Sequence, residues 1–171
     1  MTDFAVRTIP ATVHGRYLVR DGPPERLLVG FHGYGETAEA HMAELAQIPG
    51  IERWTAVAVQ ALHPFYAGRT GMIVASWMTS LDRELAIDDN REYVRSVVAQ
   101  LPAPMQLVVL GFSQGAAMAY RAAAGSNATG LIVLAATFRQ RLSRRVRNSR
   151  RCSSAEVIGR SGTPTKSSRK T

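Results

Sequence analysis

Continuous apolar runs punctuate the first 138 residues, and each has the length and the β-branched content of a buried strand. Four of them are clear, and a fifth stretch at 11–20 is weaker. The clear runs are residues 26–31, 55–62, 105–111 and 131–136. Apolar residues on every position, rather than on alternate ones, indicate strands that are covered on both faces.

Stretches with a helical period lie between these runs. Residues 38–48 and the alanine-rich residues 114–124 read as helices, and a third is marked by apolar residues at i, i+3, i+4 and i+7. Those residues are Val94, Val97, Val98 and Leu101. Asp89, three residues before Glu92, resembles a capping box that would begin this helix. Strands alternating with helices predict an α/β fold, with a mostly parallel sheet and helices on both faces.

The pattern ends near Phe138. Residues 1–138 hold ten arginines, no lysine and twelve acidic residues, a net charge of −2, whereas 139–171 hold nine arginines, two lysines and one acid, a net charge of +10. The second segment has no aromatic residue and no apolar period. High charge with low hydrophobicity predicts a disordered, basic tail at 139–171, after a folded domain at 1–138.

Candidate chemistry is concentrated at Gly111-Phe112-Ser113-Gln114-Gly115. This Gly-x-Ser-x-Gly motif stands between a predicted strand and a predicted helix, which is the context of a nucleophile elbow. Glycine at 111 and 115 removes Cβ atoms that a tight turn would not accommodate. The helix that follows places free N–H groups and a positive dipole end beside the Ser113 hydroxyl.

A second glycine-rich turn, Phe31-His32-Gly33-Tyr34-Gly35-Glu36, follows the predicted strand 26–31. In folds with a nucleophile elbow, an early turn of this kind supplies half of the oxyanion hole. The two N–H donors would be those of Tyr34 and of Gln114.

Together with Ser76-Trp77, these motifs resemble the phospholipase/carboxylesterase family of α/β-hydrolases, which includes acyl-protein thioesterases. The resemblance covers about residues 9–138. It implies hydrolysis of a small-molecule acyl ester or thioester through an acyl-enzyme on Ser113, without a cofactor. It also implies that His32 and Gly33 support the oxyanion loop. Trp77 would either line the substrate pocket or belong to the core.

The chain departs from that family after Ser113. A serine hydroxyl needs a base oriented by an acid, and in this fold both follow the serine, the acid before the histidine. No histidine and no aspartate follows Ser113, and the only acid there is Glu156. The remaining histidines do not fit the role: His32 lies in the oxyanion turn, His63 precedes a proline, and His14 and His41 are expected on the surface.

We therefore expect the hydrolase sheet to lack its last strands, and the strand at 131–136 to be an exposed edge. The hypothesis for residues 139–171 is a shifted reading frame or a comparable truncation. Reading the gene in its other two frames tests this, since one frame should encode an aspartate and then a histidine among apolar strands. The resulting chain is expected to be a poor or inactive esterase.

Two other functions stay open: a non-catalytic hydrolase-like scaffold, and a nucleic-acid binder that acts through the basic tail. The tail offers positive charge but no aromatic residues, so nucleic acid is the weaker alternative. No residues show the spacing of metal ligands, and no run is long enough for a membrane span. The single Cys152 and the lack of a secretory signal predict a cytoplasmic protein.

Overall fold

The computed structural model describes residues 4–134 and 155–158, the latter as backbone only. It contains a six-stranded sheet in the order β1-β3-β2-β6-β7-β8. All neighbouring pairs are parallel except β1 with β3. The strands are β1 (Tyr17–Arg20), β2 (Arg26–Phe31), β3 (Thr55–Val59), β6 (Gln106–Phe112), β7 (Gly130–Leu134) and β8 (Ala155–Ile158).

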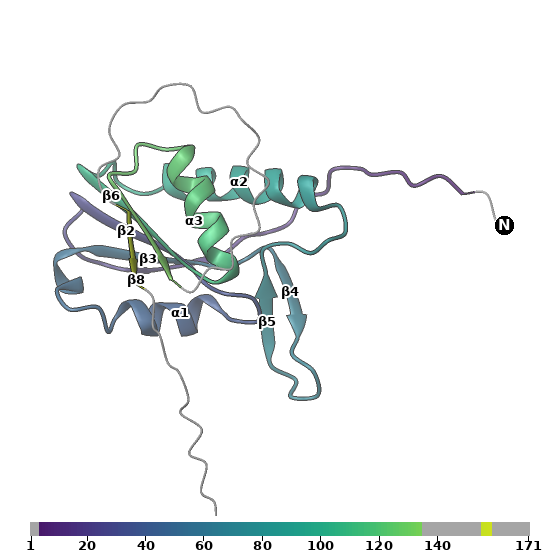
Figure 1. Ribbon diagram of the computed structural model, residues 1–171, viewed down its shortest axis with the longest axis horizontal. Coiled ribbons are helices and arrows are strands. Elements are labelled where there is room, and N and C mark those ends of the chain that lie inside the picture. Colours follow the sequence, from purple (N-terminus) through teal and green to yellow (C-terminus); the bar gives the residue numbers. More distant parts are fainter. Residues whose placement is uncertain (1–3, 135–154, 159–171) are drawn as a thin grey trace, which may run out of the picture.

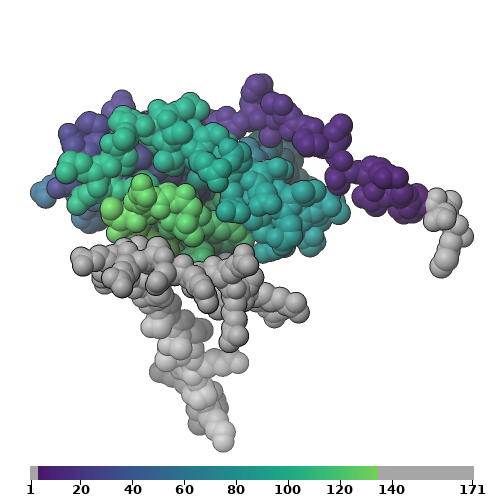
Figure 2. Space-filling view, turned by 90° about the horizontal axis from the view of Figure 1, so that it is seen from above, coloured from purple at the N-terminus to yellow at the C-terminus, as the bar shows by residue number. Residues whose placement is uncertain are grey.

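Helices cover both faces of this sheet, as the sequence predicted (Figure 1). The helix α1 (Ala38–Leu45) lies on one face, and α2 (Arg83–Ala99) and α3 (Gln114–Ala124) lie on the other. A short 3-10 helix, Ile51–Arg53, precedes β3. In Figure 2, the face that carries α2 and α3 is seen with the N-terminal segment extending away from it.

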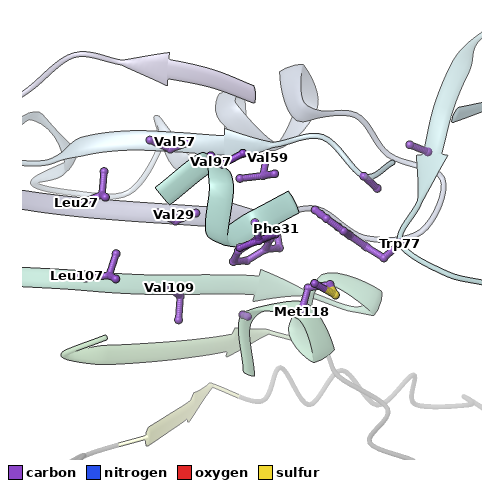
Figure 3. Close-up of a cluster of buried hydrophobic side chains, with 14 of the residues drawn as sticks. Leu27, Val29, Phe31, Val57, Val59, Trp77, Val97, Leu107, Val109 and Met118 are labelled. Carbon is purple, nitrogen blue, oxygen red and sulfur yellow. The ribbon is translucent and has the colours of Figure 1, made fainter. Parts of the chain in front are cut away.

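The core has two layers because successive strand residues point to opposite faces. Leu27, Val29 and Phe31 of β2 belong to the layer under α2 and α3, together with Trp77 and Met118 (Figure 3). Leu28, from the same strand, packs under α1. Both faces of the central strands are thus buried, which accounts for their unbroken apolar sequences.

Several predicted boundaries are wrong by a few residues. The first strand begins at Tyr17 rather than at residue 11, and the third ends at Val59 rather than at residue 62. The predicted capping box is also wrong, because Asp89 and Glu92 both lie inside α2, which begins after Asp82. Backbone N–H groups in the middle of a helix are already bonded, so Asp89 has none to cap.

The sequence did not predict the hairpin of β4 (His63–Tyr66) and β5 (Ile73–Ser76). These strands pair antiparallel and project from the end of the main sheet (Figure 1).

The predicted exposure of His41 is also wrong. It was expected on the helix surface but is 2% exposed, because α1 turns it onto β2 at Gly30, where no side chain occupies the space.

The last strand, β8, lies in the predicted tail. It pairs in parallel with β7, from Leu131 beside Ala155 to Leu134 beside Ile158. The expectation that β7 forms the sheet edge is therefore wrong, since the backbone of β8 takes that place. The other predictions for the tail, its disorder and its shifted reading frame, concern residues 135–154 and 159–171, which lie outside the described residues. They stay predictions.

Candidate active site

Ser113 lies in a sharp turn between β6 and α3. Its φ is 51° and its ψ is −112°, a left-handed conformation that side chains rarely adopt and that functional sites often hold. The residue is exposed at the N-terminus of α3, where unpaired N–H groups and the helix dipole favour a negative charge. The elbow that the sequence predicted is therefore present in its backbone geometry.

The flanking glycines stand where the chain passes over itself. A Cβ on Gly111 would lie within 3.0 Å of backbone atoms of Gly115 and Ala116. A Cβ on Gly115 would lie within 3.0 Å of the carbonyl oxygens of Phe31 and His32. The second contact brings the elbow directly against the glycine-rich turn after β2.

Sheet register explains why these two turns meet. Strands β2 and β6 are parallel neighbours, and Phe31 is paired with Gly111. The segments that follow β2 and β6 therefore leave the sheet at the same end of these strands. Within the described residues, no hydrogen bond uses the N–H of Tyr34 or of Gln114. Two N–H groups on adjacent turns are thus available to an anion.

His32 supports this turn from within the core. Its Nε2 accepts a 3.0 Å hydrogen bond from the N–H of Ala61, so the proton is on Nδ1, which donates to the carbonyl of Gly33 at 2.7 Å. Burial lowers the pKa of the His32 ring, against the opposing effect of its bond to Gly33. Both ring nitrogens are engaged and the side chain is fully buried, so His32 is not placed to act as a base.

Glu36 holds the other side of the same turn, a role that was not predicted from the sequence. Its Oε2 accepts a hydrogen bond of 2.6 Å from the N–H of Gly33. Its backbone carbonyl accepts from Ala75 of β5 at 3.0 Å, and the N–H of Gly35 donates to the Ala75 carbonyl at 3.0 Å. The turn is therefore fastened to the hairpin. The signal in the sequence was a carboxylate three residues after Gly33.

Gln114 also does more than the sequence indicated, because its side chain joins the elbow to the segment after β5. Oε1 accepts from the N–H of Trp77 at 2.8 Å, and Nε2 donates to the carbonyl of Met78 at 2.9 Å. The hydroxyl of Ser76 lies 3.2 Å from the same Oε1. Residues 75–78 thus contact both turns, through Glu36 at one and Gln114 at the other.

Known structures share the fold of this chain. Acyl-protein thioesterase 2 from Zea mays matches at a TM-score of 0.57 and 21% identity, over 72% of this chain and 62% of that one. Esterase PE8 matches at 0.57 and 22%, over 72% and 65%. The chain has the α/β-hydrolase fold. A phospholipase/carboxylesterase from Dyadobacter fermentans matches at 0.52 and 23%, over 71% and 60%.

The chain therefore spans less than two thirds of the length of these three α/β-hydrolases. No known family pattern and no curated protein sequence matches it. At 21–23% identity, the similarity to these structures shows a shared fold alone.

Within this fold, Trp77 belongs to the core, which was the second of its two predicted roles. The side chain is fully buried, and its indole N–H donates to the carbonyl of His32 at 2.8 Å. Its ring lies edge-on to Phe31, with centroids 5.5 Å apart. Trp77 lines neither of the two cavities described in the molecule.

Ser113 has no hydrogen-bonded base among the residues that the structure describes. Among the described residues, none forms a hydrogen bond with the Ser113 hydroxyl. His14 and His63 are exposed, and His41, on the buried side of α1, has Glu44 as the partner of its Nδ1 at 3.1 Å. The same part of the chain holds no metal-like cluster of histidine, cysteine and carboxylate groups, and no helix there is long and apolar enough to cross a bilayer.

Proposed function

We propose that this chain is a serine ester hydrolase of the phospholipase/carboxylesterase type, with Ser113 as the acyl acceptor. One observation carries the proposal: an exposed serine with a φ of 51° stands at a helix N-terminus, against a turn on the neighbouring parallel strand. Such backbone strain persists only when the surrounding structure enforces it, and here two glycines and the Gln114 side chain do so.

The chemical step follows from this geometry. The Ser113 oxygen attacks the carbonyl carbon of an ester or thioester, and the carbonyl oxygen takes the negative charge. The N–H groups of Tyr34 and Gln114 stabilise that charge. Collapse of the intermediate expels the alcohol or thiol and leaves the acyl group on Ser113, and water then releases the acid.

Proton transfer limits the rate in this proposal. Because no described side chain bonds to the Ser113 hydroxyl, its proton passes to water rather than to a positioned imidazole. Hydrolases that lose triad members keep roughly 10³–10⁴-fold of rate over water, which comes from the oxyanion hole and from binding. We expect the same class of residual activity here.

The apolar surroundings of the turn favour an acyl substrate. The Tyr34 ring is 62% exposed and stacks on Phe65 of β4, with centroids 5.3 Å apart. Tyr66 and Ile73 of the hairpin are exposed as well. An apolar acyl group could pack against this surface beside the two N–H donors.

Labelling with a fluorophosphonate and hydrolysis of an activated aryl ester test the proposal. We expect slow labelling that maps to Ser113, slow ester turnover without a burst, and loss of both in Ser113→Ala. Ser80→Ala, at another exposed serine, is the matched control and should behave like the unmodified chain. Absence of label at Ser113 would overturn the hydrolase function.

A second candidate function is a non-catalytic hydrolase-like scaffold. The lack of a partner for the Ser113 hydroxyl within residues 4–134 favours it, since the fold would then present an elbow that performs no chemistry. The same experiment separates the two, because a scaffold gives neither label nor turnover. A rapid burst that Ser113→Ala abolishes would instead show a fully active enzyme and would contradict the expected impairment.

A further inference from the structure

A cavity of about 210 Å³ lies between α2 and α3, above the sheet face that they cover. Its floor is apolar and comes from Phe31, Leu107 and Val109 of β2 and β6, with Met118 of α3 beside them (Figure 3). Phe31, at the end of β2, contributes to the floor, but Ser113 and the turn residues 32–36 do not line the cavity. It is therefore distinct from the candidate active site.

Three arginines stand around this apolar cavity: Arg91 and Arg95 of α2, and Arg121 of α3. Two of them are neutralised on their own helix. Arg91 pairs with Asp88 at 3.3 Å, and Arg95 pairs with Glu92 at 2.5 Å.

Arg121 differs from the other two. Within the described part of the chain no carboxylate lies at ion-pair distance, and its contact is with the sulfur of Met118 at 3.9 Å. Burial lowers the pKa of Arg121, and the positive charges of Arg83 and Arg91 act in the same direction, against the smaller opposing effect of Glu84. A partly desolvated cation without an anionic partner is costly, and an anion from outside would relieve that cost.

We propose that this cavity binds a small amphiphilic carboxylate, an ionised medium-chain fatty acid, with its alkyl chain on the sheet floor and its carboxylate on Arg121. A guanidinium matches a carboxylate with two parallel hydrogen bonds. An apolar pocket with one well-placed charge is the usual form of a small-ligand site.

The charges also argue against the chain's own tail as the occupant. Residues 139–171 carry a net charge of +10, and their one acid is Glu156, whereas the cavity presents cations. A neutral lipid would leave the Arg121 charge unpaired. The site does not depend on ester hydrolysis, so it stands or falls separately from the proposed function.

Calorimetric titration of the full chain with octanoate tests the site. We expect saturable binding of one octanoate, and binding of octan-1-ol at least tenfold weaker, because the alcohol lacks the charge. In Arg121→Gln we expect octanoate affinity to fall about tenfold or more, the usual loss for a hydrogen-bonded charge. Arg53→Gln, which removes an exposed arginine on the 3-10 helix, should bind as the unmodified chain does.

Two further variants complete the test. Ala122→Leu narrows the cavity from its α3 wall and should weaken octanoate binding while Arg121 is retained. Ser113→Ala should bind octanoate normally, which separates this site from the hydrolase proposal. Equal affinity for octanol and octanoate would overturn the proposal. Octanoate binding that survives in Arg121→Gln would also overturn it, because the carboxylate would then be held by another part of the chain, such as the basic tail.

Discussion

The residues around Ser113 are constrained chiefly by backbone contacts. Gly115 touches two carbonyl oxygens at the end of β2, and Gly111 touches the first turn of α3. Neither position has room for a side chain, whatever the chemistry of that side chain. The two glycines of the motif are therefore explained by steric limits alone.

Gly115→Ala should destabilise the chain by roughly 1–3 kcal/mol, because the added methyl group must displace the backbone of β2 or α3. Fluorophosphonate labelling of Ser113 should fall as well. Gly125→Ala is the matched control, since the nearest atom to a Cβ there lies at 3.4 Å. Urea denaturation measures both variants, and equal stability of the two would contradict the steric argument.

Gln114→Ala should slow labelling of Ser113 although the backbone N–H of residue 114 is retained. The substitution removes the hydrogen bonds to Trp77 and Met78, and we expect a loss of about 1–3 kcal/mol in unfolding free energy. Gln47→Ala, at an exposed glutamine, should change neither quantity. Unchanged labelling in Gln114→Ala would show that the segment 76–78 does not position the elbow.

At the scale of elements, α1 is joined to the sheet by a buried histidine. Nε2 of His41 has no hydrogen-bond partner among the described residues, while Nδ1 faces Glu44. Burial lowers the pKa of His41 below its ordinary value of 6.5, and the hydrogen bond and charge of Glu44 oppose this only in part. The folded chain therefore binds this proton less readily than the unfolded chain does.

The sign of the pH dependence follows. Stability should be fully present above the ordinary histidine pKa of 6.5 and should fall as the pH drops below it, toward the lowered folded value. His32 acts in the same direction. In His41→Gln the decline of unfolding free energy between pH 7 and 5 should be shallower, whereas His14→Gln, at an exposed site, should keep the original slope. An unaltered slope in His41→Gln would refute this assignment.

The sequence alone placed β2 and α3 correctly, because the apolar run of β2 and the alanine-rich run of α3 are unambiguous patterns. The hairpin was missed because the segment His63-Pro64-Phe65-Tyr66 shows no alternation of apolar and polar residues and contains a proline. The burial of His41 depends on a glycine eleven residues earlier in another element, which a helical period cannot reveal. The links from Glu36 and Gln114 to residues 75–78 are likewise products of packing, whereas the elbow was local enough to be predicted.

For the whole molecule, the outer side of β7 is the point where the hydrolase sheet depends on the basic segment. The backbone of β8 pairs with all but the first residue of β7, from Leu131 to Leu134. A parallel strand left without this partner would present unpaired backbone groups and an apolar sequence, which favours edge-to-edge association.

Removal of residues 139–171 should therefore cause concentration-dependent aggregation, measured by light scattering. Removal of 159–171 alone, which keeps β8, should leave the chain as dispersed as the full-length protein. If the two truncations behave alike, β8 does not protect the sheet.

The contact between Gly115 and the end of β2 has a consequence for how such a site can be gained or lost. The elbow and the glycine-rich turn after β2 form one unit, built from residues 26–134 and fixed by strand register and by the hydrogen bond from the Ser113 N–H to the Leu134 carbonyl. The base and acid of a complete hydrolase are not needed to build it. Under the proposed function, adding a histidine beside Ser113 and an acid to orient it should raise the rate of ester hydrolysis without any change to the elbow, so the chain is a starting point for engineering a complete hydrolase.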